Sequence, residues 1–172
     1  TRNDGPVQHG DLVLIDAGIE VDSFYTADIT RTLPISGKFS PAQRALYMLV
    51  YEAQLAGFAA VKPGAIFSDI NKACQAVLAK GLADMGVLTV SAEESLRPEV
   101  GLHRRWTLHG VSHHLGLDVH DCAKARKENY TDAVLREGMI LTVEPGLYIQ
   151  PDDELFTPEY RGIGIRIEDD VL

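Results

Sequence analysis

The sequence has 172 residues, 45% of them hydrophobic and 24% charged, which is the composition of a single globular domain and not of a disordered or fibrous chain. Its formal net charge of −9 argues against a nucleic acid or an anionic membrane as partner, because both attract clustered Lys and Arg. No run of about 18 apolar residues and no signal-peptide pattern is present, so we expect a cytoplasmic protein. Cys74 and Cys122 stand apart, which argues against disulfide scaffolds and thiolate zinc sites.

The first 35 residues predict an antiparallel β-hairpin. Residues 11–16 form an apolar run that ends in an acid, and residues 25–35 are β-branched and alternate in polarity. Both patterns are typical of strands, and a turn near Asp22 and Ser23 would join them. The run that ends at Asp16 reads as a buried strand.

A long helix is predicted after the hairpin. Ser40 has the position of an N-cap, Pro41 that of the first helical residue, and Gln43 completes a capping box. Helical apolar spacing follows until residues 62–64, Lys-Pro-Gly, end the helix.

A second helix is predicted from Ser68 or Asp69 to Gly81. Its buried face is formed by apolar residues at helical spacing: Ile70, Ala73, Cys74, Val77 and Leu78. Residues 84–108 are irregular, with a short helix after Ser91. Three further strands are predicted over residues 115–120, 139–149 and 162–172. Strands that precede paired helices, together with antiparallel hairpins, indicate the α+β class.

The last predicted strand has two different faces. Alternation places three isoleucines on one face and a polar, glycine-rich set on the other: Ile163, Ile165 and Ile167 against Gly162, Gly164, Arg166 and Glu168. Two glycines followed by Arg166 and Glu168 are typical of a strand whose backbone is approached closely by another group. A half-exposed strand with a surface ion pair would explain this strand equally well. Residues 141–144 repeat the pattern, with Glu144 held extended by Pro145.

Four acids form a candidate metal site. Asp16 or Asp28 alone would be an ordinary cap or salt-bridge partner. Together with Glu144 and Glu168 they supply four negative charges, which match two divalent cations, and one neutral imidazole would complete the ligand set. Such an oxygen-rich site favours manganese, cobalt or magnesium. Two such cations can activate water, so the chemistry indicated is hydrolysis.

The histidines of residues 109–121 divide by context. His109 and His113 have the spacing of zinc-binding helices, but the glycines around them make a poor helix, and no Glu follows His109. We therefore take His113 as the ligand, and His109 and His120 as hydrogen-bonding groups near the substrate. The other histidines are interpreted as side chains outside the site: His9, His103 and His114.

Five segments, in order, resemble the metallopeptidase family of aminopeptidase P and prolidase. They are LIDAG (14–18), ADITRT (27–32), HGVSHHLGLDVHD (109–121), VEPGLY (143–148) and RGIGIRIEDD (161–170). The last is more similar to bacterial aminopeptidase P than to prolidase. The resemblance covers nearly the whole chain and implies the pita-bread fold.

The resemblance implies a dinuclear centre, usually of manganese with cobalt or zinc as alternatives. Its ligands would be Asp16, Asp28, His113, Glu144 and Glu168. In such enzymes a metal-bound hydroxide attacks the carbonyl of an Xaa-Pro bond. Glu144 would also shuttle the proton, and His109 and His120 would contact the substrate and the tetrahedral intermediate. Arg166 would orient a ligand acid.

Two departures from the family pattern stand out. Asp16 and Asp28 are separated by one residue more than is common, which we place in the turn near Asp22. The family domain also begins further upstream, with a strand that carries another active-site histidine, and its last strand runs further. We therefore expect residues 1–172 to be one pita-bread catalytic domain, trimmed at both ends and without the N-terminal domain.

The function expected is that of an Xaa-Pro aminopeptidase, which removes the N-terminal residue from peptides with proline at the second position. One alternative is prolidase, which cleaves Xaa-Pro dipeptides with the same metals. The other is a non-catalytic pita-bread module that binds peptides. The full-length protein could form homo-oligomers.

Overall fold

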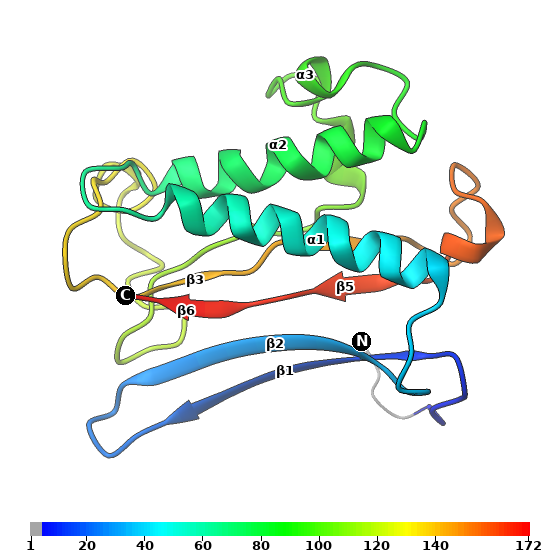
Figure 1. Ribbon diagram of the computed structural model, residues 1–172. Helices are drawn as coiled ribbons and strands as arrows, with labels where there is room; N and C mark the ends of the chain where they lie inside the picture. Colours follow the sequence, from blue (N-terminus) through cyan, green and yellow to red (C-terminus); the bar gives the residue numbers. More distant parts are fainter. Residues whose placement is uncertain (1–4) are drawn as a thin grey trace.

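The computed structural model describes residues 5–172. Its helices are α1 (Pro41–Ala60), α2 (Ser68–Asp84) and the short α3 (Ala92–Ser95), and its strands are β1 (Leu12–Glu20), β2 (Thr26–Pro34), β3 (Leu141–Val143), β4 (Gly146–Tyr148), β5 (Gly164–Arg166) and β6 (Asp169–Val171). Short 3-10 turns lie at Leu102–Arg105, Lys127–Asn129 and Pro158–Tyr160. Figure 1 shows α1 and α2 side by side over the later strands, with the β1–β2 hairpin beyond them. These elements confirm the predicted α+β class.

The predicted hairpin is present, with its turn at Asp22 and Ser23. The expectation that the first strand ends buried at Asp16 is wrong, because β1 continues to Glu20 and is exposed from Ile15 onward. Among the described residues, β1 pairs along one side only, with β2, and so forms the edge of the sheet. Asp16 therefore lies in the middle of an edge strand.

The two long helices begin where the sequence predicts. Ser40 accepts a hydrogen bond from the backbone N–H of Gln43, and the Gln43 side chain accepts one from Ser40, so the capping box is complete. The predicted end of α2 at Gly81 is wrong, since the helix continues to Asp84. A Cβ at Gly81 would clash with the Leu49 side chain, so this glycine allows close helix packing. Gly86, with φ +74°, follows the helix end instead.

The later strands form one antiparallel arrangement with the hairpin. β3 pairs with β6, β4 pairs with β5, and a bridge from Thr30 to Glu168 joins β2 to the segment between β5 and β6. The predicted continuous strands over 139–149 and 162–172 are wrong, because each is divided in two. Pro145 has no N–H to donate, which interrupts the ladder beside Glu144 and Glu168. The two acids thus stand at the breaks.

The strand predicted over residues 115–120 is also wrong, because this segment consists of bends. Its backbone bonds locally, with Gly116 N–H donating to Asp118 and Asp121 N–H donating to His114. Residues 111–114 instead run along β3, where Thr142 donates to the His113 carbonyl. The alternating polarity of this segment therefore belongs to a loop and not to a strand.

The core lies between the helices and one face of the later strands. Ile163, Ile165 and Ile167 are buried, as alternation predicted, and pack in one cluster with Leu46 and Val50 of α1. The opposite face of the same strands carries the polar side chains. Across residues 5–172 no helix has the length and apolar character needed to cross a bilayer.

Candidate metal centre

The five expected ligands lie on five adjacent segments. They are, in order across the sheet, Asp16 on β1, Asp28 on β2, Glu168 between β5 and β6, Glu144 between β3 and β4, and His113 on the flanking segment. Asp16 and Asp28 share a face, because Thr30 lies opposite Asp16 and is two residues from Asp28. The sheet therefore gathers on one face acids that are up to 152 positions apart in the sequence.

The donor atoms of these residues form overlapping groups of three. Asp16, Asp28 and Glu168 each offer an atom within 4.8 Å of the others, and so do His113, Glu144 and Glu168. A further group joins Asp28 and His113 to His120. Two adjacent donor groups that share one carboxylate suit two neighbouring cations.

Burial opposes the charged forms of these acids. Burial, followed by the nearby charge of Glu168, raises the pKa of Glu144 to about 8. Burial likewise raises the pKa of Glu168 to about 7, although the hydrogen bond from Thr30 opposes this. The pKa of Asp28 is raised by burial and then by the charge of Asp16. Divalent cations would stabilise all of these carboxylates in their charged forms.

One buried atom supports the fit of a cation directly. Glu168 is almost fully buried, and within residues 5–172 its Oε1 atom has no hydrogen-bond partner. A carboxylate oxygen left without a partner in the interior is costly. Coordination to a cation would satisfy it.

His113 is held in the tautomer of a ligand. Its Nδ1 atom lies 3.2 Å from the carbonyl oxygen of His114, which can only accept, so Nδ1 carries the proton. The other ring nitrogen, Nε2, lies 3.4 Å from Asp28 Oδ2 and 3.5 Å from Glu144 Oε1. Its lone pair is therefore directed into the cluster of acids.

Arg166 connects three of these acids. Its Nη2 atom pairs with Asp16, and its Nε atom lies 3.9 Å from Glu144 Oε2 and 3.8 Å from Glu168 Oε2. The guanidinium is half-buried, so these interactions are less screened than surface ion pairs. Arg166 therefore contacts three of the acids, and its role in orienting a ligand acid stays a prediction.

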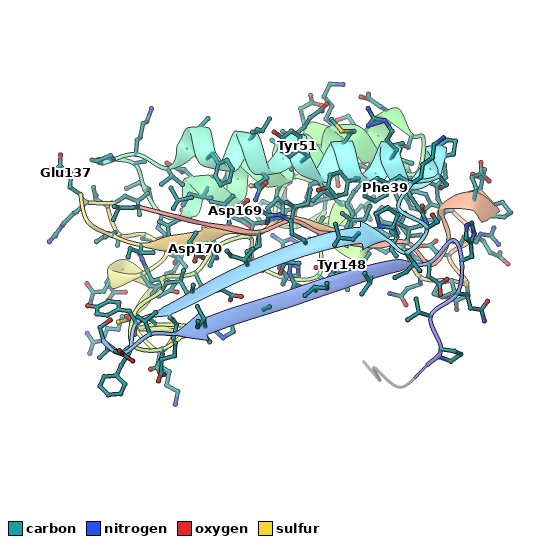
Figure 2. All side chains as sticks on the ribbon, turned by 60° about the horizontal axis from the view of Figure 1, so that its bottom comes forward. Phe39, Tyr51, Glu137, Tyr148, Asp169 and Asp170 are labelled. Atoms are coloured by element: carbon teal, nitrogen blue, oxygen red, sulfur yellow. The ribbon has the colours of Figure 1, made fainter. Side chains whose placement is uncertain are left out.

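Sequence reasoning missed Tyr148, the last residue of β4, which is labelled beside the hairpin in Figure 2. Its ring fills the space over two glycines, since a Cβ at Gly146 would lie 2.6 Å from the Tyr148 hydroxyl oxygen and one at Gly164 would lie 3.4 Å from the ring. The hydroxyl accepts from Arg166 Nη1 at 3.3 Å. The sequence predicted that some group lies against the glycine-rich face of the last strand, and at Gly164 that group is the Tyr148 side chain. The alternation of Gly146 with Tyr148 was the signal in the sequence.

The remaining histidines differ in their surroundings, and the substrate contacts expected of His109 and His120 stay predictions. His109 lies 2.7 Å from the Tyr148 hydroxyl and, through Nδ1, 2.7 Å from the Gly110 carbonyl. His120 is exposed, with its ring 4.5 Å from that of His113. The three histidines placed outside the site belong to none of the donor groups found in the described chain: His9 is exposed, His103 is bonded to Ser95, and His114 packs on Phe67 and Tyr130.

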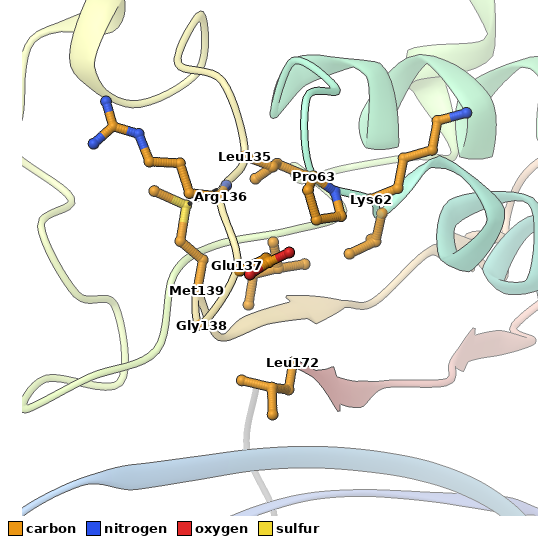
Figure 3. Close-up of a pocket in the computed structure, with 10 residues that line it drawn as sticks. Lys62, Pro63, Leu135, Arg136, Glu137, Gly138, Met139 and Leu172 are labelled. Carbon is orange, nitrogen blue, oxygen red and sulfur yellow. Dashed lines mark hydrogen bonds between the residues drawn. The ribbon is translucent and has the colours of Figure 1, made fainter.

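A separate small cavity lies beside the end of α1 (Figure 3). It encloses about 190 Å³ between the end of α1 and the loop around Glu137, with Leu172 at its rim. None of the four acids and the one histidine of the centre lines it. The chemistry therefore belongs to the sheet face and not to this cavity.

The fold and this site define a class, the pita-bread domains of metallopeptidases. A model of metallopeptidase family M24 matches residues 1–172. The chain belongs to this family.

Relatives with established names agree with this assignment. Xaa-Pro aminopeptidase 1 of Streptomyces coelicolor is 59% identical over 171 residues, covering 99% of the chain and 34% of the relative. Xaa-Pro aminopeptidase of Escherichia coli is 43% identical, covering 100% and 38%. The structure of Pseudomonas aeruginosa aminopeptidase PepP superposes with a TM-score of 0.89 at 43% identity, covering 98% of this chain and 37% of that one. The chain thus spans about a third of the length of these relatives.

Proposed function

We propose that the protein containing this chain is an Xaa-Pro aminopeptidase, which hydrolyses the bond before a proline in second position and releases the N-terminal amino acid. The proposal assigns two divalent cations, manganese foremost, to Asp16, Asp28, His113, Glu144 and Glu168. The observation that carries it is the pair of donor groups that share Glu168. The names of the similar proteins support the substrate class.

The chain's own residues have distinct roles in this reaction. Two bound cations would supply Lewis acidity and lower the pKa of a water molecule. Glu144, with its raised pKa, takes up and returns the proton that the reaction moves. His120 is exposed and can bond the peptide, whereas His109 must first exchange its bond to Tyr148 or Gly110. Arg166 keeps Asp16 in place.

Metal binding is the first test of the proposal. The chain is stripped with EDTA and titrated with MnCl2 by isothermal titration calorimetry, and bound metal is counted by elemental analysis. We expect two manganese ions per chain, and the loss of at least one in Glu168→Ala. The control Glu137→Ala removes an exposed acid beside the separate cavity and should bind like the wild type.

The substrate class is tested on the metal-loaded protein with two peptides. Release of the first residue from a tripeptide with proline in second position, with slower cleavage of an Xaa-Pro dipeptide, supports the aminopeptidase. Preference for the dipeptide would make the protein a prolidase. Failure of a folded wild-type chain to bind manganese would contradict the metal centre and leave a peptide-binding module.

A further inference from the structure

The hydroxyl group of Thr30 lies between two members of the centre. Thr30 is fully buried on β2, and its Oγ1 atom donates to Glu168 Oε2 at 2.6 Å. The Nε atom of Arg166 lies 3.1 Å from the same Oγ1. No sequence pattern singled this residue out.

The direction of both hydrogen bonds is determined by chemistry. An arginine Nε–H can only donate, so Thr30 Oγ1 accepts from Arg166. The hydroxyl has one hydrogen, and a carboxylate oxygen only accepts, so that hydrogen goes to Glu168 Oε2. Thr30 therefore accepts a hydrogen bond from the Arg166 guanidinium and donates one to the Glu168 carboxylate.

These hydrogen bonds determine which oxygen of Glu168 remains free to bind a cation. The Glu168 backbone N–H donates to the Thr30 carbonyl at 3.0 Å, so the two residues are joined through both backbone and side chain. With Oε2 bonded to Thr30, the buried Oε1 atom is left without a hydrogen-bond partner in the described part of the chain. Glu168 is also the residue common to both donor groups.

We propose that Thr30 is a positioning residue, whose hydroxyl holds the Glu168 carboxylate in the orientation that both cations require. The inference rests on the proposed metal centre and adds a residue to it. Hydrogen-bonding partners of metal ligands commonly contribute a factor of about 10 to 100 in metal affinity. Thr30 would be such a partner for the ligand on which the whole pair of sites depends.

Thr32 provides a matched control within the same strand. It is also a fully buried threonine, two residues along β2 and on the same face. Within residues 5–172 its hydroxyl bonds only to backbone, donating to the Arg166 carbonyl at 2.9 Å and accepting from the Arg166 N–H at 3.2 Å. Removal of the Thr32 hydroxyl disturbs the sheet without touching a ligand carboxylate.

The test compares manganese binding by Thr30→Val, Thr30→Ser and Thr32→Val, each in the stripped 172-residue chain. Calorimetric titration with MnCl2 should show Kd raised about 10-fold to 100-fold for Thr30→Val. Thr30→Ser retains the hydroxyl and should stay within about threefold of the wild type, as should Thr32→Val. Thermal melts verify that each variant is folded. If Thr30→Val does not melt cooperatively, Thr30→Cys replaces it, because a thiol is a weak donor.

Two results would overturn the role of Thr30 while the metal centre stands. In the first, the wild type and Thr30→Val bind manganese with the same Kd. In the second, Thr32→Val loses as much affinity as Thr30→Val, which would make the effect a general one on β2. A folded wild-type chain that binds no manganese would instead refute the proposed function, and the role of Thr30 with it.

Discussion

Manganese binding should release protons from the metal-free protein at neutral pH. Burial raises the pKa of Glu144 to about 8 and that of Glu168 to about 7. At pH 7 the first acid is therefore mostly protonated and the second about half protonated. Carboxylate ligands must be deprotonated to bind a metal, so loading the centre should release about one to two protons in total.

The number of released protons is measured by calorimetry in buffers of different ionisation enthalpy. The slope of the observed enthalpy against the buffer enthalpy equals the number of protons. Since protonation competes with the metal, affinity should rise with pH between about 6 and 8. At pH 9 both acids are already charged, so their contribution to the slope should approach zero, and only the proton lost by a metal-bound water remains.

Glu144→Gln removes the group that contributes most to the release. This variant keeps the size of the side chain but cannot ionise, so the slope at pH 7 should fall by about one proton. A wild-type slope of zero at pH 7 would refute the reasoning, because it would mean that burial does not keep these acids protonated. An equal slope at pH 7 and pH 9 would refute it as well.

Three further changes test the packing and the ion pairs. Gly57→Ala on α1 places a Cβ 2.6 Å from Val143 Cγ1; overpacking of about 1 to 3 kcal/mol exceeds the helix-propensity gain, so urea unfolding should show a net loss of about 1 kcal/mol. Asp153→Ala leaves the buried Trp106 indole N–H, bonded at 2.7 Å, without its acceptor and should lower the unfolding free energy by about 2 to 3 kcal/mol. Arg166→Lys keeps the charge but loses the branched set of contacts, and manganese Kd should rise about tenfold.

Each of these changes has a control or a contrary result. Gly5→Ala adds a Cβ in open space and should leave the unfolding free energy unchanged, so equal effects at both glycines would contradict the packing argument. Asp153→Ala with wild-type stability would show that Trp106 finds another acceptor. Arg161→Lys alters an arginine that bonds a backbone carbonyl away from the donor groups, and its manganese Kd should not change.

Local rules predicted the elements whose stability is local. The capping box at Ser40, the start of α2 at Ser68 and the hairpin turn at Asp22 each depend on neighbours within a few residues, and all three are present. The errors lie where distant packing overrides the pattern. Helix α2 continues past Gly81, where the sequence predicted its end. That glycine is needed for the close contact with Leu49 of α1 and does not act as a helix stop.

The sequence predicted the donor residues of the candidate site, but it did not reveal the residues that contact and position them. Period-two alternation placed Arg166 and Glu168 on the face opposite the buried isoleucines, and that face carries the centre. Thr30 was missed because an ordinary threonine on a strand carries no sign of a role, and Tyr148 was missed although its alternation with Gly146 was a signal. Their contacts with Arg166 and Glu168 exist only after strands from opposite ends of the chain have paired.

What the sequence alone determined is therefore the set of available donors and the faces on which they lie, because both follow from residue type and strand periodicity. The tertiary structure decided which donors meet. Thr30 and Glu168 are 138 residues apart, and no local preference specifies their bridge. Sheet pairing brings them together and buries the acids, and burial raises the pKa values of Glu144 and Glu168.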